Sequence, residues 1–447
     1  MDQVLTPKTV VRTDSSGMAC EVGQFLGGGG QGEVYRARLG GKPVALKWYF
    51  LQTATPEQRV ALEILVKKGP PNDKFLWPID TASAPAVSGF GYVMPLRETR
   101  YKSLFDLMKG RIDPSFGALV TAGVQLADSF LQLHAKGLCY RDISFGNVFF
   151  DPNTGDVLIC DNDNVTIDGS SPGGVLGTPD FMAPEIVRGE GRPNSHTDLF
   201  SLAVLLFYMF HVQHPLFGKR LLNIRCLDLP ARTKLCGLEP IFIFDPNDRS
   251  NEAVSRSVDP MGEAGANALK YWKIYPQFVR NLFTKAFTDG IRDAQNGRVR
   301  ESEWRAAMVR LRDSILYCPH CGAENFYDAD SLNAPGAKPA PCWSCMKEII
   351  LPYRIRIGRN VVMLNHDSKL FLHHVDDQKM YDFSKPVAEV TRHPAKPSIW
   401  GLKNVSTEKW VGVATDGSVK DVEPGRAVPL VIGLKINFGR AEGEIRR

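Results

Sequence analysis

The sequence lacks any uninterrupted apolar run long enough to cross a membrane. Its longest uninterrupted run, Leu202 to Phe210, falls well short of the ~20 residues that a membrane-spanning helix requires. Residues 1–30 contain no basic segment followed by an apolar one, so we expect no secretory signal. Neither sign of charge dominates, since 54 Lys and Arg stand against 49 Asp and Glu, and such a mixed surface argues against a nucleic-acid-binding protein. These absences predict a cytoplasmic protein with no membrane or nucleic-acid partner.

Cysteine is too scattered to predict a disulfide framework. Five of the nine cysteines stand singly, and the other four form two Cys-x-x-Cys pairs. This pattern is typical of a metal site in a reducing compartment. With 447 residues, 43% of them hydrophobic, the chain is long enough for more than one globular domain.

The apolar pattern predicts a strand-rich region followed by a helical one. Residues 15–97 contain runs typical of β-strands, and residues 98–315 show helical spacing. One amphipathic helix is expected in the first region, between Pro56 and Lys68. Its packed face would consist of three apolar residues: Val60, Ile64 and Leu65.

Composition divides the remainder of the chain. Residues 218–269 are rich in Pro, Asp, Asn and Gly, which predicts an extended insertion rather than core. Residues 316–349 form a compact segment of Cys, Pro and Gly. From residue 350 to residue 447, short alternating runs separated by turn signals predict a β-sandwich or barrel.

A glycine-rich segment precedes a lysine in the first region. Gly27, Gly29 and Gly32, followed by Val34, fit a loop whose backbone approaches phosphate oxygens, because a Cβ would clash there. A flexible hairpin is the alternative interpretation of these glycines. Lys47 ends a buried-strand pattern, and a cation at that place is suited to gripping phosphates.

Three oxygen-bearing side chains predict a metal-dependent centre. Asp142 is suited to accept or orient the proton of a hydroxyl group, and Asn147 follows five residues later. Asp161 ends an apolar strand run fourteen residues after Asn147. Carboxylate and amide oxygens are the ligands that Mg²⁺ or Mn²⁺ prefers. We therefore predict that Asn147 and Asp161 are the metal ligands.

Taken in order, these residues resemble the signature set of eukaryotic-type (Hanks-type) serine/threonine protein kinases. The resemblance covers residues 15–315 and implies the α+β bilobal kinase fold, with a β-rich small lobe and an α-helical large lobe. It implies ATP as the phosphate donor and Glu63 as the partner of Lys47, with Glu57 as the competing candidate. Three further parts would complete the nucleotide pocket: Ala45 on a strand, Met94 as the gatekeeper, and Pro95, Leu96 and Arg97 as the hinge.

The same resemblance implies supporting and regulatory roles. Glu185 and Arg298 would form an ion pair beneath the activation segment, and Asp198 would brace the catalytic loop. Thr178, within Gly-Thr-Pro, favours serine and threonine over tyrosine as acceptors. Arg141 would bind a phosphorylated activation loop. The available acceptors, for which plain turn residues are the alternative interpretation, are Thr166, Ser170 and Ser171.

Two features depart from the kinase pattern. Ser144 stands two positions after Asp142, where these kinases carry a lysine that neutralises the transferring phosphoryl group. The triplet Asp161-Asn162-Asp163 keeps the metal-binding aspartate but replaces the Phe and Gly of Asp-Phe-Gly. A divergent active kinase is our leading hypothesis, and a nucleotide-binding pseudokinase scaffold is the alternative.

The two Cys-x-x-Cys pairs have the spacing of a zinc ribbon. Cys318 and Cys321 are separated from Cys342 and Cys345 by twenty residues, which predicts a closed structural site of four thiolates. A redox pair is the alternative. His320, inside the first pair, is interpreted as a bystander.

The C-terminal residues loosely resemble forkhead-associated domains, which bind phosphothreonine peptides through Arg and Ser on loops. Arg359 and Ser406 would be such a pair. A docking module without phosphopeptide recognition is the interpretation that we favour.

The order of domains resembles that of bacterial kinases with appended zinc ribbons, including those beside a metal-dependent phosphatase and a von Willebrand-type adhesion protein in tellurite-resistance-type stress clusters. This resemblance implies a signalling kinase that phosphorylates itself and protein substrates, with a cognate phosphatase and an adhesion-type regulator as partners. A third hypothesis, a zinc-dependent nucleic-acid adaptor, rests on the Cys pairs and the basic C-terminal region. The balanced charge of the remaining chain opposes it.

Overall fold

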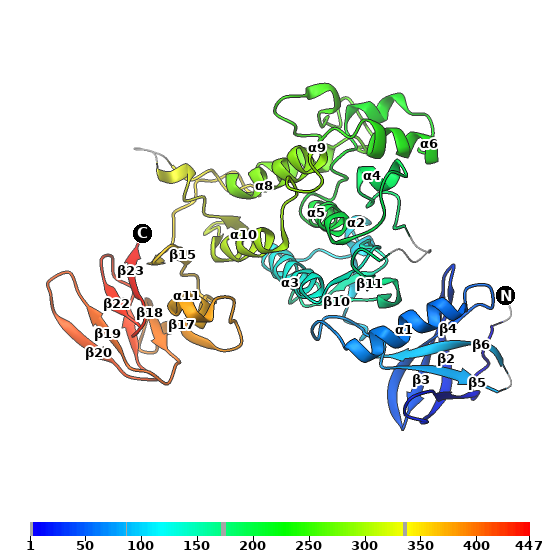
Figure 1. Ribbon diagram of the computed structural model, residues 1–447. Helices are drawn as coiled ribbons and strands as arrows, with labels where there is room; N and C mark the ends of the chain where they lie inside the picture. Colours follow the sequence, from blue (N-terminus) through cyan, green and yellow to red (C-terminus); the bar gives the residue numbers. More distant parts are fainter. Residues whose placement is uncertain (1–2, 86, 171–175, 334–337) are drawn as a thin grey trace. The chain divides into compact units, whose positions relative to one another are not determined.

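The computed structural model describes residues 3–85, 87–170, 176–333 and 338–447. Two compact units make up the chain (Figure 1). The first comprises Met1–Trp272 and Arg280–Ala306, and the second comprises Lys273–Val279 and Ala307–Arg447. The expected division at residues 15–315, 316–349 and 350–447 stays a prediction.

The first unit begins with a closed barrel in the strand order β1-β2-β3-β4-β6-β5. Tyr35, Trp48 and Val93 are fully buried inside it, so bulky apolar residues fill the barrel. The β-rich small lobe expected from the sequence is present. Its strands are β1 (Val10–Thr13), β2 (Ala19–Gly28), β3 (Gly32–Leu39), β4 (Lys42–Tyr49), β5 (Asp80–Ala84) and β6 (Val87–Met94).

Helix α1 (Pro56–Lys68) begins where the sequence predicts. The hydroxyl of Thr55 accepts the backbone N–H of Gln58, and proline at the first helical position needs no partner for a missing N–H. Leu62 packs in a cluster of buried side chains with Tyr49. The contact of Leu62 with this cluster fixes the helix on the barrel.

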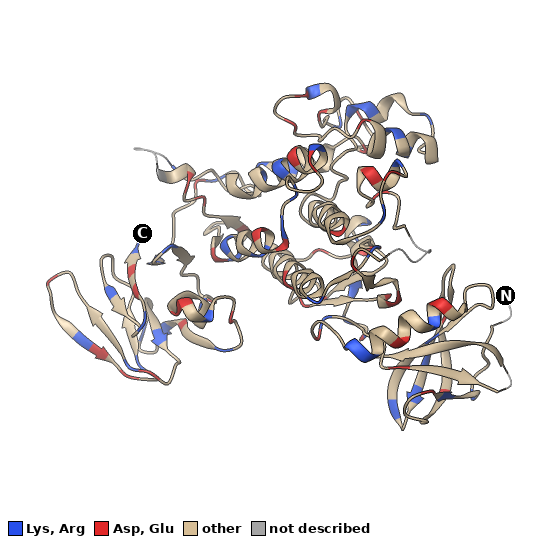
Figure 2. Cartoon of the chain, viewed as in Figure 1, with Lys and Arg blue, Asp and Glu red and all other residues tan. Residues whose placement is uncertain are grey.

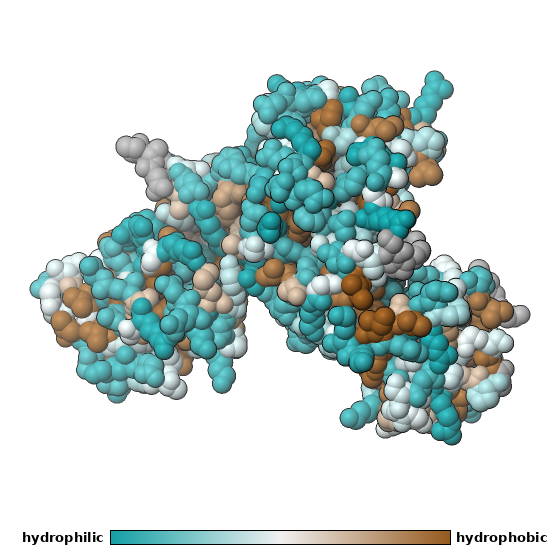
Figure 3. Space-filling view, in the orientation of Figure 1, coloured by the Kyte–Doolittle hydropathy of each residue, from teal (hydrophilic) through white to brown (hydrophobic). Residues whose placement is uncertain are grey.

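The expected packed face of α1 is wrong in two of its three residues. Leu65 is buried, but Val60 and Ile64 are 55% and 38% exposed. Together with Ile167 of β11 (Thr166–Ile167) they line an exposed apolar groove, and Figure 3 shows apolar side chains gathered over α1 and β11. Apolar residues lie on two sides of this helix, and only the tertiary fold decides which side is covered.

Two long helices form the core of the helical lobe. Helix α5 (Ser195–His211) is capped by Asn194, which exchanges hydrogen bonds with Thr197. It is buried on all sides, which accounts for the continuous apolar run in its sequence. Helix α3 (Phe116–Ala135) is long and apolar enough to cross a membrane, yet 67% of its most apolar stretch is buried inside the protein, as in a core helix.

The remaining short elements up to residue 313 connect and surround these helices. They are β7 (Lys102–Ser103), α2 (Leu104–Met108), β8 (Leu138–Cys139), β9 (Val148–Phe150), β10 (Val157–Ile159), α4 (Pro184–Val187), α6 (Leu229–Arg232), α7 (Ala266–Trp272), α8 (Gln277–Phe287), α9 (Asp289–Arg292) and α10 (Glu301–Asp313).

The expected extended insertion over residues 218–269 is instead partly core. Phe242 and Ile243 are buried almost completely. The Phe242 ring lies 5.7 Å from that of Phe207 on α5 and 5.2 Å from that of Phe287, centroid to centroid. The Pro- and Asp-rich composition hid these two apolar anchors, and burying them stabilises the segment by removing large apolar surface from water.

In the second unit, two antiparallel sheets share one hydrophobic core. Their orders are β15-β14-β23-β22-β19-β20 and β16-β17-β18-β21. Ile355 and Ile436 of the first sheet and Leu370 and Leu402 of the second are all fully buried. The elements are β12 (Ile315–Tyr317), β13 (Glu324–Phe326), β14 (Arg354–Ile357), β15 (Asn360–Met363), β16 (Lys369–Phe371), α11 (Leu372–Val375), β17 (Pro386–His393), β18 (Lys396–Asn404), β19 (Trp410–Val413), β20 (Val419–Val422), β21 (Ala427–Pro429), β22 (Lys435–Asn437) and β23 (Glu442–Arg446).

Charges of both signs are interspersed over both units, as Figure 2 shows. Many of them pair, for example Lys74 with Asp156 at 2.6 Å and Lys403 with Glu389 at 3.2 Å. Exposed pairs contribute only ~0–1 kcal/mol each. The two units therefore owe their stability chiefly to their buried cores.

Candidate active site

A cleft of about 1030 Å³ in the first unit is lined by residues of both the barrel and the helical lobe. The β2–β3 hairpin, β4 and the end of β6 contribute one side, and the loops after β8 and β10 contribute the other. Most residues that the sequence singled out meet here: Gly27, Gly29, Gly32, Val34, Ala45, Lys47, Met94, Pro95, Leu96, Asp142 and Asp161.

The three predicted glycines have different steric surroundings. A Cβ on Gly32 would come within 2.2 Å of the carbonyl oxygen of Trp48, so the barrel itself requires glycine there. A Cβ on Gly27 or Gly29 would meet nothing within 4 Å. Because protein packing does not explain these two glycines, they fit a backbone that a phosphate group approaches closely.

The expected hinge follows strand β6 at the cleft. Met94 lies opposite Ala45 in the β4–β6 register and is 6% exposed. Pro95 has no backbone N–H and can offer an adenine ring only its carbonyl oxygen. The donors of the hinge would therefore be the N–H groups of Leu96 and Arg97.

Lys47 projects from β4 into a cluster of acidic groups. Its Nζ lies 2.7 Å from Oδ2 of Asp163 and 3.7 Å from Oδ1 of Asp161. It also donates to Oε1 of Gln31 in the glycine-rich hairpin, at 3.1 Å. Burial alone would lower the pKa of Lys47, but the two aspartates outweigh burial and raise it. The lysine is therefore charged and anchored.

The prediction that Glu63 pairs with Lys47 is wrong. Its carboxylate is 53% exposed and binds Nε of Arg59 at 3.3 Å, one turn back along α1. Glu57, the competing candidate, is exposed as well. Helix α1 instead directs Gln58 inward, where its Nε2 donates to the hydroxyl of Tyr49.

Asp142 and Asn147 lie together in the loop between β8 and β9. Nδ2 of Asn147 donates to the backbone oxygen of Asp142 at 2.8 Å and to its Oδ2 at 3.0 Å. The hydroxyl of Thr178 donates to Oδ1 of Asp142 at 2.7 Å. Because the amide nitrogen of Asn147 is engaged, its amide oxygen remains the atom that could bind a metal ion.

The donor set of the cleft fits a hard divalent cation. Asp161 adopts left-handed backbone geometry, with φ of 48°, which costs energy for a residue other than glycine. Burial raises the pKa of Asp161, Lys47 opposes this, and the nearby carboxylates of Asp163 and Asp142 raise it further. A cation bound by Asp161 and Asn147 would relieve this repulsion, and oxygen ligands suit Mg²⁺.

Residues 20–258, more than half of the chain, match the family model described as protein kinase domain. The chain belongs to the protein kinase family.

Its curated relatives include CBL-interacting protein kinase 4 of Oryza sativa subsp. japonica, 26% identical over 290 residues that make up 62% of each protein. Atypical protein kinase C of Drosophila melanogaster is 35% identical over 109 residues, 24% of this chain and 17% of that protein. The DNA damage-responsive serine/threonine-protein kinase RqkA of Deinococcus radiodurans is 28% identical over 204 residues, 43% of this chain and 30% of that protein. The matched segments thus span less than two thirds of these relatives.

The kinase domain contains the ion pair expected beneath its activation segment. Nη2 of Arg298 donates to both carboxylate oxygens of Glu185, at 2.7 and 2.8 Å. Arg298 is 4% exposed, and its Nη1 also donates to the carbonyl of His196. A buried charge held by this many partners fixes the segment that follows Thr178.

A histidine that sequence reasoning missed supports the catalytic loop. Asp198 accepts the backbone N–H groups of Tyr140 and Arg141, as the kinase resemblance predicted. His134, at the end of α3, binds Asp198 through Nε2 at 3.1 Å and Glu301 through Nδ1. Burial alone would lower the pKa of His134, but these hydrogen bonds raise it to about 9. A lone His in a helical pattern gave no signal, because its partners lie far away in the sequence.

His134 makes the stability of the kinase domain depend on pH. Its pKa rises from the ordinary value of 6.5 to about 9 on folding, so its stabilising effect is complete below pH ~6.5 and is lost as pH rises through ~9. We expect the free energy of unfolding to fall by about 3 kcal/mol across this range. The measurement is urea unfolding of wild type, His134→Gln and, as a control, His393→Gln at an exposed position. If the free energy of unfolding of His134→Gln fell with rising pH as steeply as that of wild type, His134 would not be the group responsible.

Both departures from the kinase pattern are buried. Ser144 is 5% exposed, and its backbone oxygen accepts the N–H of Asn147, so it is part of the loop's internal structure. Asn162 is fully buried, and its Nδ2 donates to the carbonyl of Ile159. Its Oδ1 has no hydrogen-bond partner within the part of the chain that the structure describes. Ser144 and Asn162 thus stand where the kinase pattern has a cation and an aromatic ring, and Asp142 and Asp161 both line the cleft.

The expected regulatory residues lie near the activation segment. Arg141 donates from Nε to the carbonyl of Asn164 and has a φ of 74°. The hydroxyls of Thr166 and Ser170 lie 3.0 Å apart. Ser171 lies outside the described residues, and the phosphorylation of these hydroxyl groups stays a prediction.

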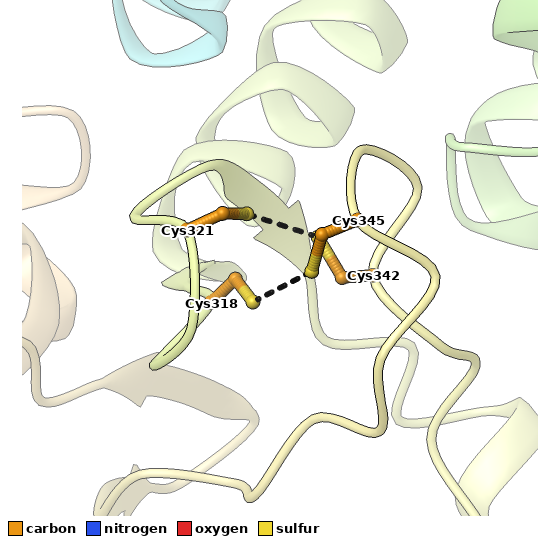
Figure 4. Close-up of side chains that lie close together, drawn as sticks. All are labelled: Cys318, Cys321, Cys342 and Cys345. Atoms are coloured by element: carbon orange, nitrogen blue, oxygen red, sulfur yellow. Dashed lines mark hydrogen bonds between the residues drawn. The ribbon is translucent and has the colours of Figure 1, made fainter.

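The four predicted cysteine ligands converge in the second unit (Figure 4). Sγ of Cys318 lies 3.7 Å from that of Cys345, and Sγ of Cys321 lies 3.7 Å from that of Cys342. All four sulfur atoms lie within 4.8 Å of one another. A tetrahedron with Zn–S bonds of ~2.3 Å has edges of about 3.8 Å, so the spacing fits zinc.

A second cluster of metal-type residues has the wrong protonation for metal binding. Nδ1 of His373 accepts the N–H of Tyr381, and Nδ1 of His374 accepts the N–H of Phe371, both at 2.9 Å. A neutral imidazole with an accepting Nδ1 carries its proton on Nε2. Nε2 of His374 therefore donates to Asp313 at 3.3 Å. We interpret this cluster as a hydrogen-bonded link between α10 and α11.

Proposed function

We propose that this chain transfers the γ-phosphate of ATP to serine or threonine hydroxyls of proteins, including its own. The observation that supports it most is the meeting of Lys47, Asp142 and Asp161 around one cleft whose glycine hairpin leaves space for phosphate. Serine/threonine kinases among the relatives, one of them bacterial, support the choice of acceptor. Bound Mg²⁺ or Mn²⁺ would neutralise charge on the transferring phosphate.

The roles of the side chains follow from their positions. Lys47, fixed at the back of the cleft, would bind the phosphates of ATP. Asp161 and the amide oxygen of Asn147 would hold the metal ion. Asp142, oriented by Asn147 and Thr178, would accept or orient the proton of the attacking hydroxyl. Catalysis of this kind depends on positioning and electrostatic stabilisation.

A second candidate function is a nucleotide-binding scaffold that signals by conformation. It is motivated by Ser144, which removes the cation that would neutralise the transferring phosphoryl group. The scaffold predicts ATP binding without turnover. The two functions therefore differ in one measurable quantity, the transfer of phosphate.

Mapping of the phosphorylated residues tests the proposed acceptor. We expect incubation with ATP and Mg²⁺ to phosphorylate serine and threonine residues of the chain and of a basic protein substrate, as located by mass spectrometry. Asp161→Ala should show none of these sites. Phosphotyrosine alone, or equal phosphorylation by Asp161→Ala, would contradict the proposal.

We propose that the four cysteines form a structural zinc ribbon. Burial would raise the pKa of Cys342, but N–H groups of Cys345, Asn325 and Ser344 outweigh burial and lower it to about 6, which favours the thiolate that binds metal. A site closed by four sulfur atoms leaves no position for a substrate and serves folding. The redox alternative would leave the chain metal-free.

Metal analysis of the purified chain tests both clusters of the second unit. We expect one zinc per chain, because, of the two clusters found among the described residues, the cysteine cluster is the one with free ligand atoms. Cys321→Ser should lose the zinc, whereas Cys226→Ser, at an exposed single cysteine, should retain it. Absence of zinc would contradict the ribbon, and two zinc ions would contradict the protonation assigned to His373 and His374.

We infer that the two sheets of the second unit form a β-sandwich of the forkhead-associated kind that serves as a docking module. The shared core of the six-stranded and four-stranded sheets supports this inference. Ser406 donates to the side chain of Asn404 at 2.7 Å, and Arg359 lies in the β14–β15 turn, where it contacts Met380. Tighter binding of phosphothreonine than of threonine peptides, lost in Arg359→Ala, would instead identify a phosphopeptide receptor.

We also propose that the kinase acts in the cytoplasm with a metal-dependent phosphatase and an adhesion-type regulator. The order of kinase domain, cysteine pairs and β-rich module supports these partners by resemblance. Removal of phosphate from the autophosphorylated chain by such a phosphatase tests the first of them.

A further inference from the structure

The carboxylate that anchors Lys47 comes from the metal-binding loop. Asp163, two residues after Asp161, places Oδ2 at 2.7 Å from Nζ of Lys47. Helix α1 supplies no carboxylate, since it directs Gln58 inward and Glu63 outward. The ion pair joins residues that are 116 positions apart.

Asp163 is buried, and both of its carboxylate oxygens accept hydrogen bonds. Its side chain is 0% exposed. Besides Lys47, its Oδ2 accepts the hydroxyl of Tyr49 at 2.5 Å, and its Oδ1 accepts the hydroxyl of Tyr92 at 3.1 Å. Nε2 of Gln58 lies 3.5 Å from its backbone oxygen. Both carboxylate oxygens are therefore engaged by side chains of β4 and β6.

This arrangement separates two roles within one triplet. Asp161 lines the cleft, and its side chain is 43% exposed, so it remains available to a metal ion. Asp163 is not among the residues that line the cleft, and its side chain is fully buried. The third position of the triplet is Gly in the kinase pattern and Asp163 in this chain. Asp163 thus supplies the carboxylate that α1 does not direct toward Lys47.

We propose that Asp163, in place of a carboxylate of helix α1, is the positioning residue that holds Lys47 toward the phosphates of ATP. This inference rests on the proposed binding of ATP, and it holds for an active kinase and for a scaffold alike. The position of Lys47 is set by two barrel strands and the loop after β10. Helix α1 contributes to this arrangement through Gln58, which donates to the hydroxyl of Tyr49, and not through a carboxylate.

A double-mutant cycle on ATP affinity tests this inference. Equilibrium binding of a fluorescent ATP analogue with Mg²⁺ is measured for wild type, Asp163→Asn, Lys47→Met and the double variant. We expect Asp163→Asn to weaken binding about tenfold and to have no further effect when Lys47 is already methionine, because it acts only through that lysine. Full additivity of the two effects would overturn the proposal.

Glu63→Ala tests independently whether Glu63 positions Lys47. The Glu63 carboxylate lies on the surface, so its loss should not disturb folding. We expect its ATP affinity to equal that of wild type. A loss as large as that of Lys47→Met would show that Glu63 is the true partner and would overturn the proposal, even if Asp163→Asn did not fold. Binding is measured apart from phosphate transfer, so an inactive wild type that binds ATP would contradict the proposed enzyme but not this inference.

Discussion

Replacing Lys47 by methionine is expected to lower the free energy of unfolding of the kinase domain by about 3 kcal/mol, because it leaves a buried carboxylate without its cation. The side chain of Asp163 is 0% exposed, and the two tyrosine hydroxyls that remain cannot neutralise its charge. The double variant with Asp163→Asn should regain most of the loss, since an amide needs no cation. Urea unfolding followed by tryptophan fluorescence measures the change.

Lys42→Met is the matched control for this result, because Lys42 begins the same strand and is exposed. Its stability should stay within ~0.5 kcal/mol of wild type. An equally small effect of Lys47→Met, or a double variant that is less stable than Lys47→Met alone, would show that Asp163 does not depend on this lysine.

Asp142→Asn is expected to reduce the rate of phosphate transfer by about 10²- to 10⁴-fold, the range typical of a lost general base. The substitution keeps the size of the side chain and its hydrogen bond from Thr178, but it removes the negative charge that attracts the proton of the hydroxyl. ATP affinity should change little, because Lys47 and the metal ion would hold the phosphates. Single-turnover transfer at saturating ATP measures the effect.

The exposed Asp113 provides the control for this charge change. Asp113→Asn should transfer phosphate at the wild-type rate. If Asp142→Asn remained fully active while Asp161→Ala were inactive, Asp142 would not be the residue that orients the acceptor.

The residues that meet in the candidate active site could be located from the sequence because each belongs to a short segment with its own pattern. Asp142 and Asn147 are five residues apart in one loop, and their hydrogen bonds lie within that loop. Lys47 and Asp161 each end an apolar strand run. The kinase resemblance also supplied the pair of Glu185 and Arg298, which the structure contains.

The errors concern pairings between distant segments. Glu63 was assigned to Lys47 by its place on an amphipathic helix, but Val60 and Ile64 on that helix are exposed and the helix faces the barrel with Leu62 instead. Spacing along a helix does not reveal its rotation when apolar residues lie on more than one side. The sequence does not reveal Asp163 as the partner of Lys47, since its tyrosine partners on β4 and β6 become neighbours only in the folded barrel.

Phe242 and His134 show the same limit. Phe242 lies in a segment whose composition is typical of a surface loop, and its burial depends on aromatic rings from α5 and α8. His134 acquires its role only when Asp198 and Glu301 meet at the end of α3. Composition and periodicity describe one segment at a time, whereas these contacts arise from packing.

The most direct test of the proposed kinase activity measures ATP binding and phosphate transfer in the same sample of the full chain, with labelled ATP and Mg²⁺. We expect that the wild type binds ATP and transfers its γ-phosphate to serine or threonine, and that Asp161→Ala transfers none. Wild-type protein that is saturated with ATP yet transfers no phosphate would contradict the kinase and identify a nucleotide-binding scaffold.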